Sequence, residues 1–305
     1  MNPATSVIFL TTLCGMGQGL FIMVLLGHLL GAHPRYLILG TVTTLILCAL
    51  GLVASFFHLG RPLRAWRSVA QYRTSWLSRE VIALPLFMLL AFLYGLSIWS
   101  GWGGAFLTGL LALAACIALW VCTAMIYMCI KFIQEWASPF TLANFVLIGL
   151  ASGATLALNV ALFSDWGMVH VLAYASLLFT LVAGGVRGAS LVRNARLKPK
   201  STLQSAIGFA DPKITQRSMG ATGGTFNTRE FFHGRTLAFL RSVKWLFIAL
   251  TFVLPALLIV SALARAPSYV VLFALSAQCV GLLLERWYFF AQARHPQNLY
   301  YQVIS

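Results

Sequence analysis

The chain has 305 residues, of which 60% are hydrophobic and only 9% are charged, and its mean hydropathy is +0.87. Soluble domains contain about 25% charged residues, so this composition excludes an ordinary soluble protein and indicates one that crosses a membrane repeatedly. The net charge of +15 does not indicate a nucleic-acid partner. The basic residues lie in loops beside apolar runs, where they set topology and meet the headgroups of membrane lipid.

Eight apolar runs are long enough to cross a membrane, which takes about 20 residues. They are continuous, unlike the short alternating segments of a membrane β-barrel. The sequence therefore predicts an all-α integral membrane protein, a bundle of eight transmembrane helices that forms a single polytopic domain over residues 1–305. The first run lacks a basic leader region and a clear cleavage site, so we expect it to be a retained helix. The expected spans are 6–30, 36–57, 80–100, 104–131, 140–162, 168–190, 237–263 and 268–290.

The connection between the second and third spans is the most polar stretch beside the membrane. Residues 58–80 hold one histidine, five arginines and one carboxylate. His58 ends the second span, and histidine suits proton transfer or hydrogen bonding because it titrates near neutral pH. Glu80 opens the third span, where a carboxylate serves either as a helix-start charge or as a proton acceptor at headgroup depth. Together with the nearby aromatic residues, this pair suits a flat, apolar ligand that carries two protons, such as a quinone.

The intramembrane polar residues away from this stretch have simpler interpretations. Arg187 is expected to extend its side chain toward the headgroups, with contact to a quinone or to Glu80 as the alternative. Glu285 and Arg286 are expected to form an ion pair. The neutral polar residues are expected to bond between helices, and they are Gln18, Asn144, Asn159 and Gln278.

No residues in the sequence show the pattern of a metal centre. The six cysteines lie inside apolar runs without any Cys-x-x-Cys pair, whereas disulfide frameworks, zinc sites and iron–sulfur clusters need clustered thiolates. Haem ligation needs two histidines at matching depth in neighbouring spans, and none of the histidines is expected mid-membrane. We therefore expect a protein without haem or an iron–sulfur cluster of its own.

The polar segment 192–235 separates the sixth and seventh spans. Connections of this length in a compact bundle are usually functional or disordered, and the aromatic residues here favour docking of a soluble partner. Of the 21 Lys and Arg residues, all except Arg35 and Arg265 fall on the side that holds this loop and both termini. The positive-inside rule then predicts that the loop and both termini are cytoplasmic, in a bacterial inner membrane.

Two motifs carry a family resemblance. Residues 58–65 (His-Leu-Gly-Arg-Pro-Leu-Arg-Ala) and 78–80 (Ser-Arg-Glu) resemble the membrane anchor subunit of the dimethyl sulfoxide reductase family. The resemblance implies a quinone site that uses His58 and Glu80, with Arg61 and Arg64 in the same motif as further quinone-binding candidates, and menaquinone or ubiquinone as the quinone. It also implies two partners, an iron–sulfur subunit and a molybdopterin catalytic subunit.

The long loop departs from the best-known sulfoxide reductase anchors, whose connection between spans six and seven is shorter. With residues 223–234 (Gly-Gly-Thr-Phe-Asn-Thr-Arg-Glu-Phe-Phe-His-Gly), it resembles the branch that anchors sulfite-oxidising molybdoenzymes. The resemblance therefore implies either sulfite oxidation or dimethyl sulfoxide reduction as the overall reaction. A secondary transporter or anion exporter is the alternative function, although transporters usually show internal repeats and broken spans. A purely structural anchor would leave the polar stretch unexplained.

Overall fold

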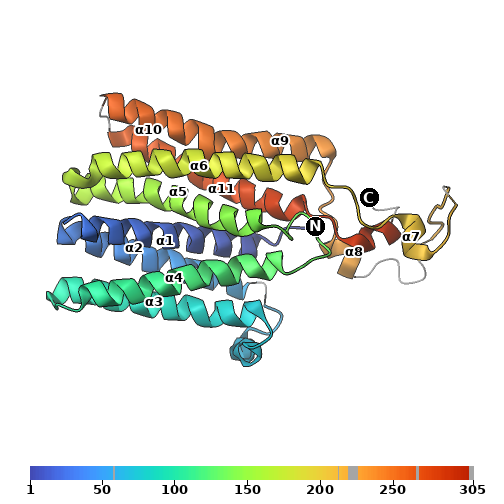
Figure 1. Cartoon of the computed structure of the whole chain (residues 1–305), viewed down its shortest axis with the longest axis horizontal. Helices are drawn as coiled ribbons and strands as arrows, with labels where there is room; N and C mark the ends of the chain where they lie inside the picture. Colours follow the sequence, from blue (N-terminus) through green and yellow to red (C-terminus); the bar gives the residue numbers. More distant parts are fainter. Residues whose placement is uncertain (58, 212, 219–225, 266–267, 302–305) are drawn as a thin grey trace.

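A computed structural model describes residues 1–57, 59–211, 213–218, 226–265 and 268–301. Eight antiparallel helices long and apolar enough to cross a membrane run through it (Figure 1), so the predicted all-α membrane bundle is confirmed. The seventh crossing is built from three consecutive helical segments. The crossings are α1 (Thr5–Leu29), α2 (Pro34–Phe56), α3 (Trp76–Ser100), α4 (Ala105–Met128), α5 (Pro139–Ser164), α6 (Val169–Ala195), α9–η3–α10 (Leu237–Ile248, Ala249–Val253 and Leu254–Arg265) and α11 (Ser268–Ala291).

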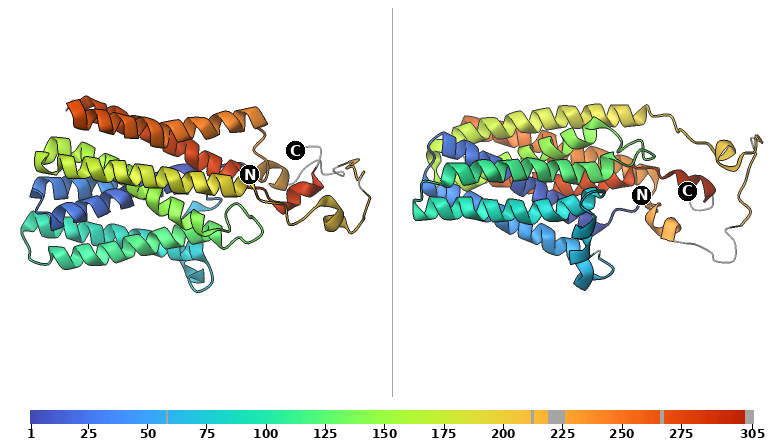
Figure 2. Two further views of the ribbon diagram at one scale, coloured as in Figure 1. Left: turned by 45° about the horizontal axis from the view of Figure 1, so that its top comes forward. Right: turned by 60° about the horizontal axis from the view of Figure 1, so that its bottom comes forward.

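One end of the bundle holds most of the structure outside these crossings, and we call it the loop end. It carries the 3₁₀ helix η1 (Pro62–Gln71), the short helices α7 (Leu203–Ile207) and α8 (Phe226–Glu230), and η4 (Pro296–Tyr300). Both described chain ends also lie there (Figures 1 and 2). At the opposite end the connections are tight turns, such as the one in which Gly101 closes α3 with a φ of +70°.

Helix α1 lies against α2, α4, α5 and α11 and is the centre of the packing. It crosses α5 so closely that a Cβ atom on Gly19 would collide with the backbone of Gly149, and one on Gly153 would collide with the backbone of Gly19. Small residues allow such close approach between membrane helices. Glycine at positions 19, 149 and 153 therefore allows α1 and α5 to approach each other this closely.

Three of the four predicted interhelical amide bonds are confirmed. Gln18 donates to the Cys116 carbonyl oxygen at 2.9 Å, Asn159 to that of Val271 at 3.3 Å, and Gln278 to that of Thr251 at 3.2 Å. These bonds join α1 to α4, α5 to α11, and α11 to η3. The Asn144 side-chain oxygen is buried without a hydrogen-bond partner in the described part of the chain.

The prediction for Arg187 is wrong. Its side chain does not reach the headgroups but is buried between α6 and α11, with the residue only 1% exposed, and its Nε lies 2.8 Å from Glu285 Oε1. The predicted ion pair of Glu285 with Arg286 is present at 3.4 Å, so Glu285 serves two guanidinium groups. Arg187 pairs with the Glu285 carboxylate of another span instead of reaching the headgroups, because a buried charge is costly unless it is paired.

Candidate functional site

Glu80 lies one turn inside α3 and does not open the helix. The helix begins at Trp76, after Ser75, whose hydroxyl accepts a hydrogen bond from the Ser78 N–H at 3.4 Å. Only the first turn of a helix offers unpaired N–H groups, so the interpretation of Glu80 as a helix-start charge is wrong. The carboxylate is instead placed against the neighbouring helices of the bundle.

The Arg79 side chain explains why the preceding basic residue does not neutralise Glu80. Its guanidinium stacks over the Trp76 ring at 4.2 Å and donates to the carbonyl oxygens of Tyr72 and Arg73 at 2.9 and 2.8 Å. These contacts hold the cation on the connection between η1 and α3. Glu80 thus faces the bundle, where the residue as a whole is partly buried.

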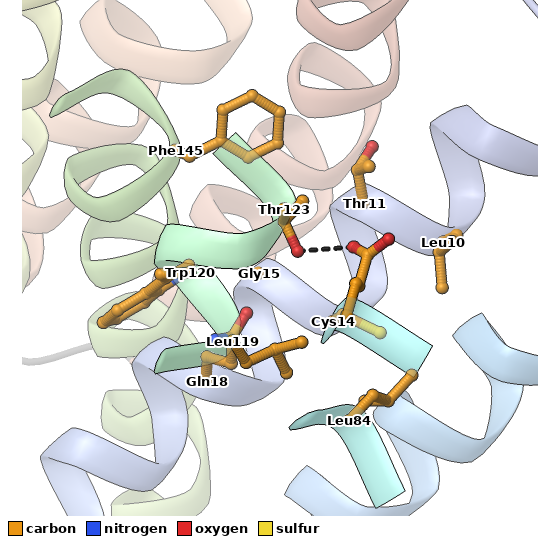
Figure 3. A pocket seen from close by; sticks show the side chains of 11 residues that line it. Leu10, Thr11, Cys14, Gly15, Gln18, Leu84, Leu119, Trp120, Thr123 and Phe145 are labelled. Carbon is orange, nitrogen blue, oxygen red and sulfur yellow. Dashed lines mark hydrogen bonds between the residues drawn. The ribbon is translucent and has the colours of Figure 1, made fainter. Parts of the chain in front are cut away.

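The partner of Glu80 is Thr123 on α4. The Thr123 hydroxyl donates to Glu80 Oε1 at 2.5 Å (Figure 3), a short hydrogen bond of the kind that carboxylates form. Nothing in the sequence singled out Thr123, because it lies within an apolar run and hydroxyls in such runs commonly bond to their own helix. Helix pairing of α3 with α4 brings the two side chains together.

A small cavity adjoins this carboxylate between α1, α3, α4 and α5 (Figure 3). Its volume is about 10 Å³, near the smallest space that can hold one water molecule. The Trp120 side chain lines it, and its indole N–H is buried without a hydrogen-bond partner among the described residues. The cavity therefore has the Glu80 carboxylate and the Thr123 hydroxyl in a mostly apolar lining. The lining residues are Leu10, Thr11, Cys14, Gly15, Gln18, Glu80, Leu84, Leu119, Trp120, Thr123 and Phe145.

The other predicted site residues are placed differently. His58 lies outside the described residues. Arg61 immediately precedes η1 and Arg64 lies within it, and both are exposed and absent from the cavity lining. Helix η1 also exposes Leu63 and Trp66 at the loop end. The structure thus gathers the arginines on a surface near α3 and does not bring them to the Glu80 carboxylate.

The cavity is too small for a quinone ring, because small-molecule pockets typically enclose about 300–1,000 Å³ and this one encloses about 10 Å³. The residue Glu80 is partly buried, and its Oε1 is held by the Thr123 hydroxyl.

These features define a class: a multi-pass, all-helical membrane protein with a hydrogen-bonded carboxylate near one membrane face and polar structure gathered at that end. Comparison with known proteins identifies the family within this class. A family profile described as DMSO reductase anchor subunit (DmsC) matches residues 1–292. The chain is also 46% identical, over the full length of both proteins, to a sulfite dehydrogenase subunit of Allochromatium vinosum.

The chain belongs to the DMSO reductase anchor subunit family. It is therefore a membrane anchor of a molybdoenzyme complex, associated with catalytic subunits, and the family resemblance predicted from residues 58–65 and 78–80 is confirmed. The transporter alternative is set aside on the same finding.

Proposed function

We propose that this anchor exchanges electrons between a partner iron–sulfur subunit and the membrane quinone pool, with Glu80 as the proton-exchanging residue. The observation that carries the proposal is the Glu80–Thr123 hydrogen bond beside a cavity of single-water size. Converting a quinone to a quinol takes up two protons along with two electrons, and the reverse reaction releases them. A carboxylate whose Oε1 is held in place by the Thr123 hydroxyl is suited to exchange a proton with a ring oxygen placed against it.

The catalytic role of His58 and the quinone-binding roles of Arg61 and Arg64 are part of this proposal. Arg61 and Arg64 are exposed beside α3, where fixed positive charge favours an electron-rich ring or an acidic partner surface. His58 lies outside the described residues, directly after α2. Its proposed role is to bond the quinone oxygen opposite the one served by Glu80, with menaquinone or ubiquinone as the quinone.

The loop end is the proposed docking face for the iron–sulfur and molybdopterin subunits, and the positive-inside rule assigns it to the cytoplasm of a bacterial inner membrane. The segment 192–235 packs on the chain's own C-terminal residues. The Phe231 ring stacks on His295 with centroids 3.8 Å apart, Asn298 donates to the Phe231 carbonyl oxygen at 3.1 Å, and Tyr300 donates to that of Ala206 at 3.0 Å. These contacts support a partly ordered platform, which lowers the entropy lost when a partner binds.

The similarity to a sulfite dehydrogenase protein supports sulfite oxidation as the overall reaction. In that direction two electrons from sulfite would pass through the partner subunits to the quinone, and Glu80 would deliver one of the two protons that the ring takes up. Dimethyl sulfoxide reduction would need electron flow in the opposite sense, with Glu80 accepting one of the two protons that the quinol releases.

The test compares Glu80→Gln with the wild type in the assembled, purified complex. Sulfite-dependent quinone reduction is expected to fall about 100-fold or more, within the usual range for loss of an acid–base group. Sulfite-dependent reduction of a soluble dye that accepts electrons directly from the partner subunits is expected to stay unchanged.

Glu135→Gln is the matched control. Glu135 is another glutamate near the loop end, and it accepts a long bond of 3.5 Å from the Arg294 backbone N–H. The same substitution there is expected to leave both activities intact. Full quinone turnover in an assembled Glu80→Gln complex would refute the proposal.

A further inference from the structure

The 3₁₀ helix η1 joins the loop ends of α2 and α3 and packs against α3. Five residues (57–61) link it to α2, and four residues (72–75) link it to α3. At about 3.5 Å per residue, these short links hold η1 beside the ends of two membrane spans. In Figure 1 the helix is seen nearly end-on next to α3, and in Figure 2 it projects sideways from the bundle, so its axis runs across the spans.

An exposed apolar row runs along η1. A 3₁₀ helix has three residues per turn, so side chains three positions apart lie one above the other. Leu63 and Trp66 are 95% and 70% exposed, and Val69 and Tyr72 continue the spacing and are also exposed. In an α-helix these positions would drift by about 60° at each step, and Leu63 and Tyr72 would point to opposite sides. The 3₁₀ form therefore keeps four large apolar side chains on one uncovered face.

A row of arginines runs beside the apolar row. Arg64 and Arg67 lie within η1, and Arg61 and Arg73 flank it at multiples of the same three-residue spacing. All four are exposed. None of them forms an ion pair in the described part of the chain, where both ion pairs involve Glu285. The connection therefore presents four positive charges without a counter-charge, which favours an anionic partner.

The two rows meet through neighbouring side chains. The Arg67 guanidinium lies 5.5 Å from the centre of the Trp66 ring, and Arg73 Nε donates to the Tyr72 hydroxyl at 3.1 Å. Charged groups thus border an apolar strip, as in helices that rest in the surface layer of a bilayer. The third row of η1 faces the protein with small, partly buried residues, which are Ala65 and Ser68.

We propose that η1 is an in-plane helix that binds anionic phospholipid at the membrane face of the loop end. Its apolar row would enter the boundary between headgroups and acyl chains, while Arg67 and Arg73 bond to lipid phosphates. Tryptophan and tyrosine are enriched at this depth, and Trp66 and Tyr72 supply them here. A soluble acidic partner fits this face less well, because η1 projects sideways and lies apart from α7 and α8, which extend along the direction of the spans (Figure 1).

Arg79 connects the proposed lipid contact to the third span. Its guanidinium donates to the carbonyl oxygens of Tyr72 and Arg73 at the end of η1, and Glu80 is the next residue. Lipid that binds only the packed form of η1 would therefore stabilise the first turn of α3. This binding does not depend on proton exchange at Glu80, because neither exposed row of η1 lines the Glu80 cavity.

The test is photolabelling of the purified full chain, alone and in its assembled complex, in phosphatidylcholine nanodiscs. The probe is a trace of phosphatidylglycerol, or of phosphatidylcholine, with a diazirine high in one acyl chain. Mass spectrometry is expected to find at least about tenfold more label on residues 63–72 from the phosphatidylglycerol probe. The double variant Arg67→Gln/Arg73→Gln should lower this label about tenfold or more, since each arginine near an anionic surface gives about a fivefold preference. Arg67→Lys/Arg73→Lys keeps both charges and should keep most of the label.

Lys213→Gln/Arg217→Gln is the matched control, because it removes two exposed positive charges from the segment that follows α7, away from η1. It should leave the label unchanged. Leu63→Ser/Trp66→Ser removes half of the apolar row and should lower the label from both probes at least about fivefold. The proposal is overturned if residues 63–72 carry no label, if both probes label them equally, or if Arg67→Gln/Arg73→Gln leaves the label intact. Loss of the label when the partner subunits assemble would also overturn it and would assign this face to an acidic protein surface.

Discussion

Replacing Glu285 with Gln tests whether the buried charge cluster is organised as the structure shows. The Glu285 carboxylate, fully buried, is the counter-charge for both Arg187 and Arg286. Glu285→Gln keeps the shape of the side chain but leaves two buried guanidinium groups without a counter-charge. Arg187→Gln removes one guanidinium and leaves a neutral pair of Glu285 with Arg286. The two changes each remove one charge, yet their costs are expected to differ.

Removing one partner of a buried ion pair costs about 3–5 kcal/mol, and we expect Glu285→Gln to fall in that range. Arg187→Gln should cost less, because the remaining carboxylate keeps a partner at 3.4 Å. The double variant restores the surplus of one positive charge found in the wild type. Its cost should therefore be smaller than the sum of the two single costs, as coupling between contacting residues predicts.

The chain's own cysteines provide the assay. Four of them are buried, and Cys129 is exposed, so a thiol-reactive fluorescent dye reports unfolding in detergent above a constant background. At about 2–4 °C per kcal/mol, Glu285→Gln should lower the unfolding temperature by about 6–20 °C. A Glu285→Gln protein as stable as the wild type, or an Arg187→Gln protein that is the less stable of the two, would refute the assignment of the cluster.

Three further predictions concern the site, the packing and the loop end. Thr123→Val should lower quinone turnover in the complex about tenfold, as loss of one hydrogen bond to a charged group implies. Thr123→Ser keeps the hydroxyl and should keep the turnover, so an equal loss of turnover in both variants would show that the hydroxyl is not the cause. Gly19→Ala should prevent assembly of a stable bundle, because the added Cβ meets the backbone of Gly149, whereas Gly15→Ala meets nothing within 4 Å and should be tolerated; yield and unfolding temperature in detergent decide between them. Burial and the nearby N-terminal ammonium lower the pKa of His295 below its usual 6.5 in the folded protein. As the pH falls below 6.5, the released loop therefore binds a proton more readily than the packed loop, so proteolysis of the 192–235 segment should rise from pH 7.5 to pH 5.5. The same rise in a His295→Gln protein would exclude this histidine as the cause.

The sequence by itself determined the architecture and the family. Runs of about 20 apolar residues must become helices in lipid, because only internal hydrogen bonds satisfy the backbone there. That rule predicted the ends of the eight crossings to within three residues, apart from the start of α3 and the end of α6. There the helix continues four and five residues beyond the predicted span, through the polar residues Ser78, Arg79, Arg193 and Asn194. The motif at 58–65 and 78–80 indicated the family because its polar residues stand out against an apolar chain.

The tertiary structure alone decided which polar groups meet. Thr123 and Glu80 lie 43 residues apart on different helices, and Arg187 and Glu285 lie on α6 and α11. No sequence pattern relates such pairs, since hydropathy fixes that a helix crosses the membrane but not its rotation or its neighbours. Those are set by packing of small residues such as Gly19 and Gly153, where backbones come into contact.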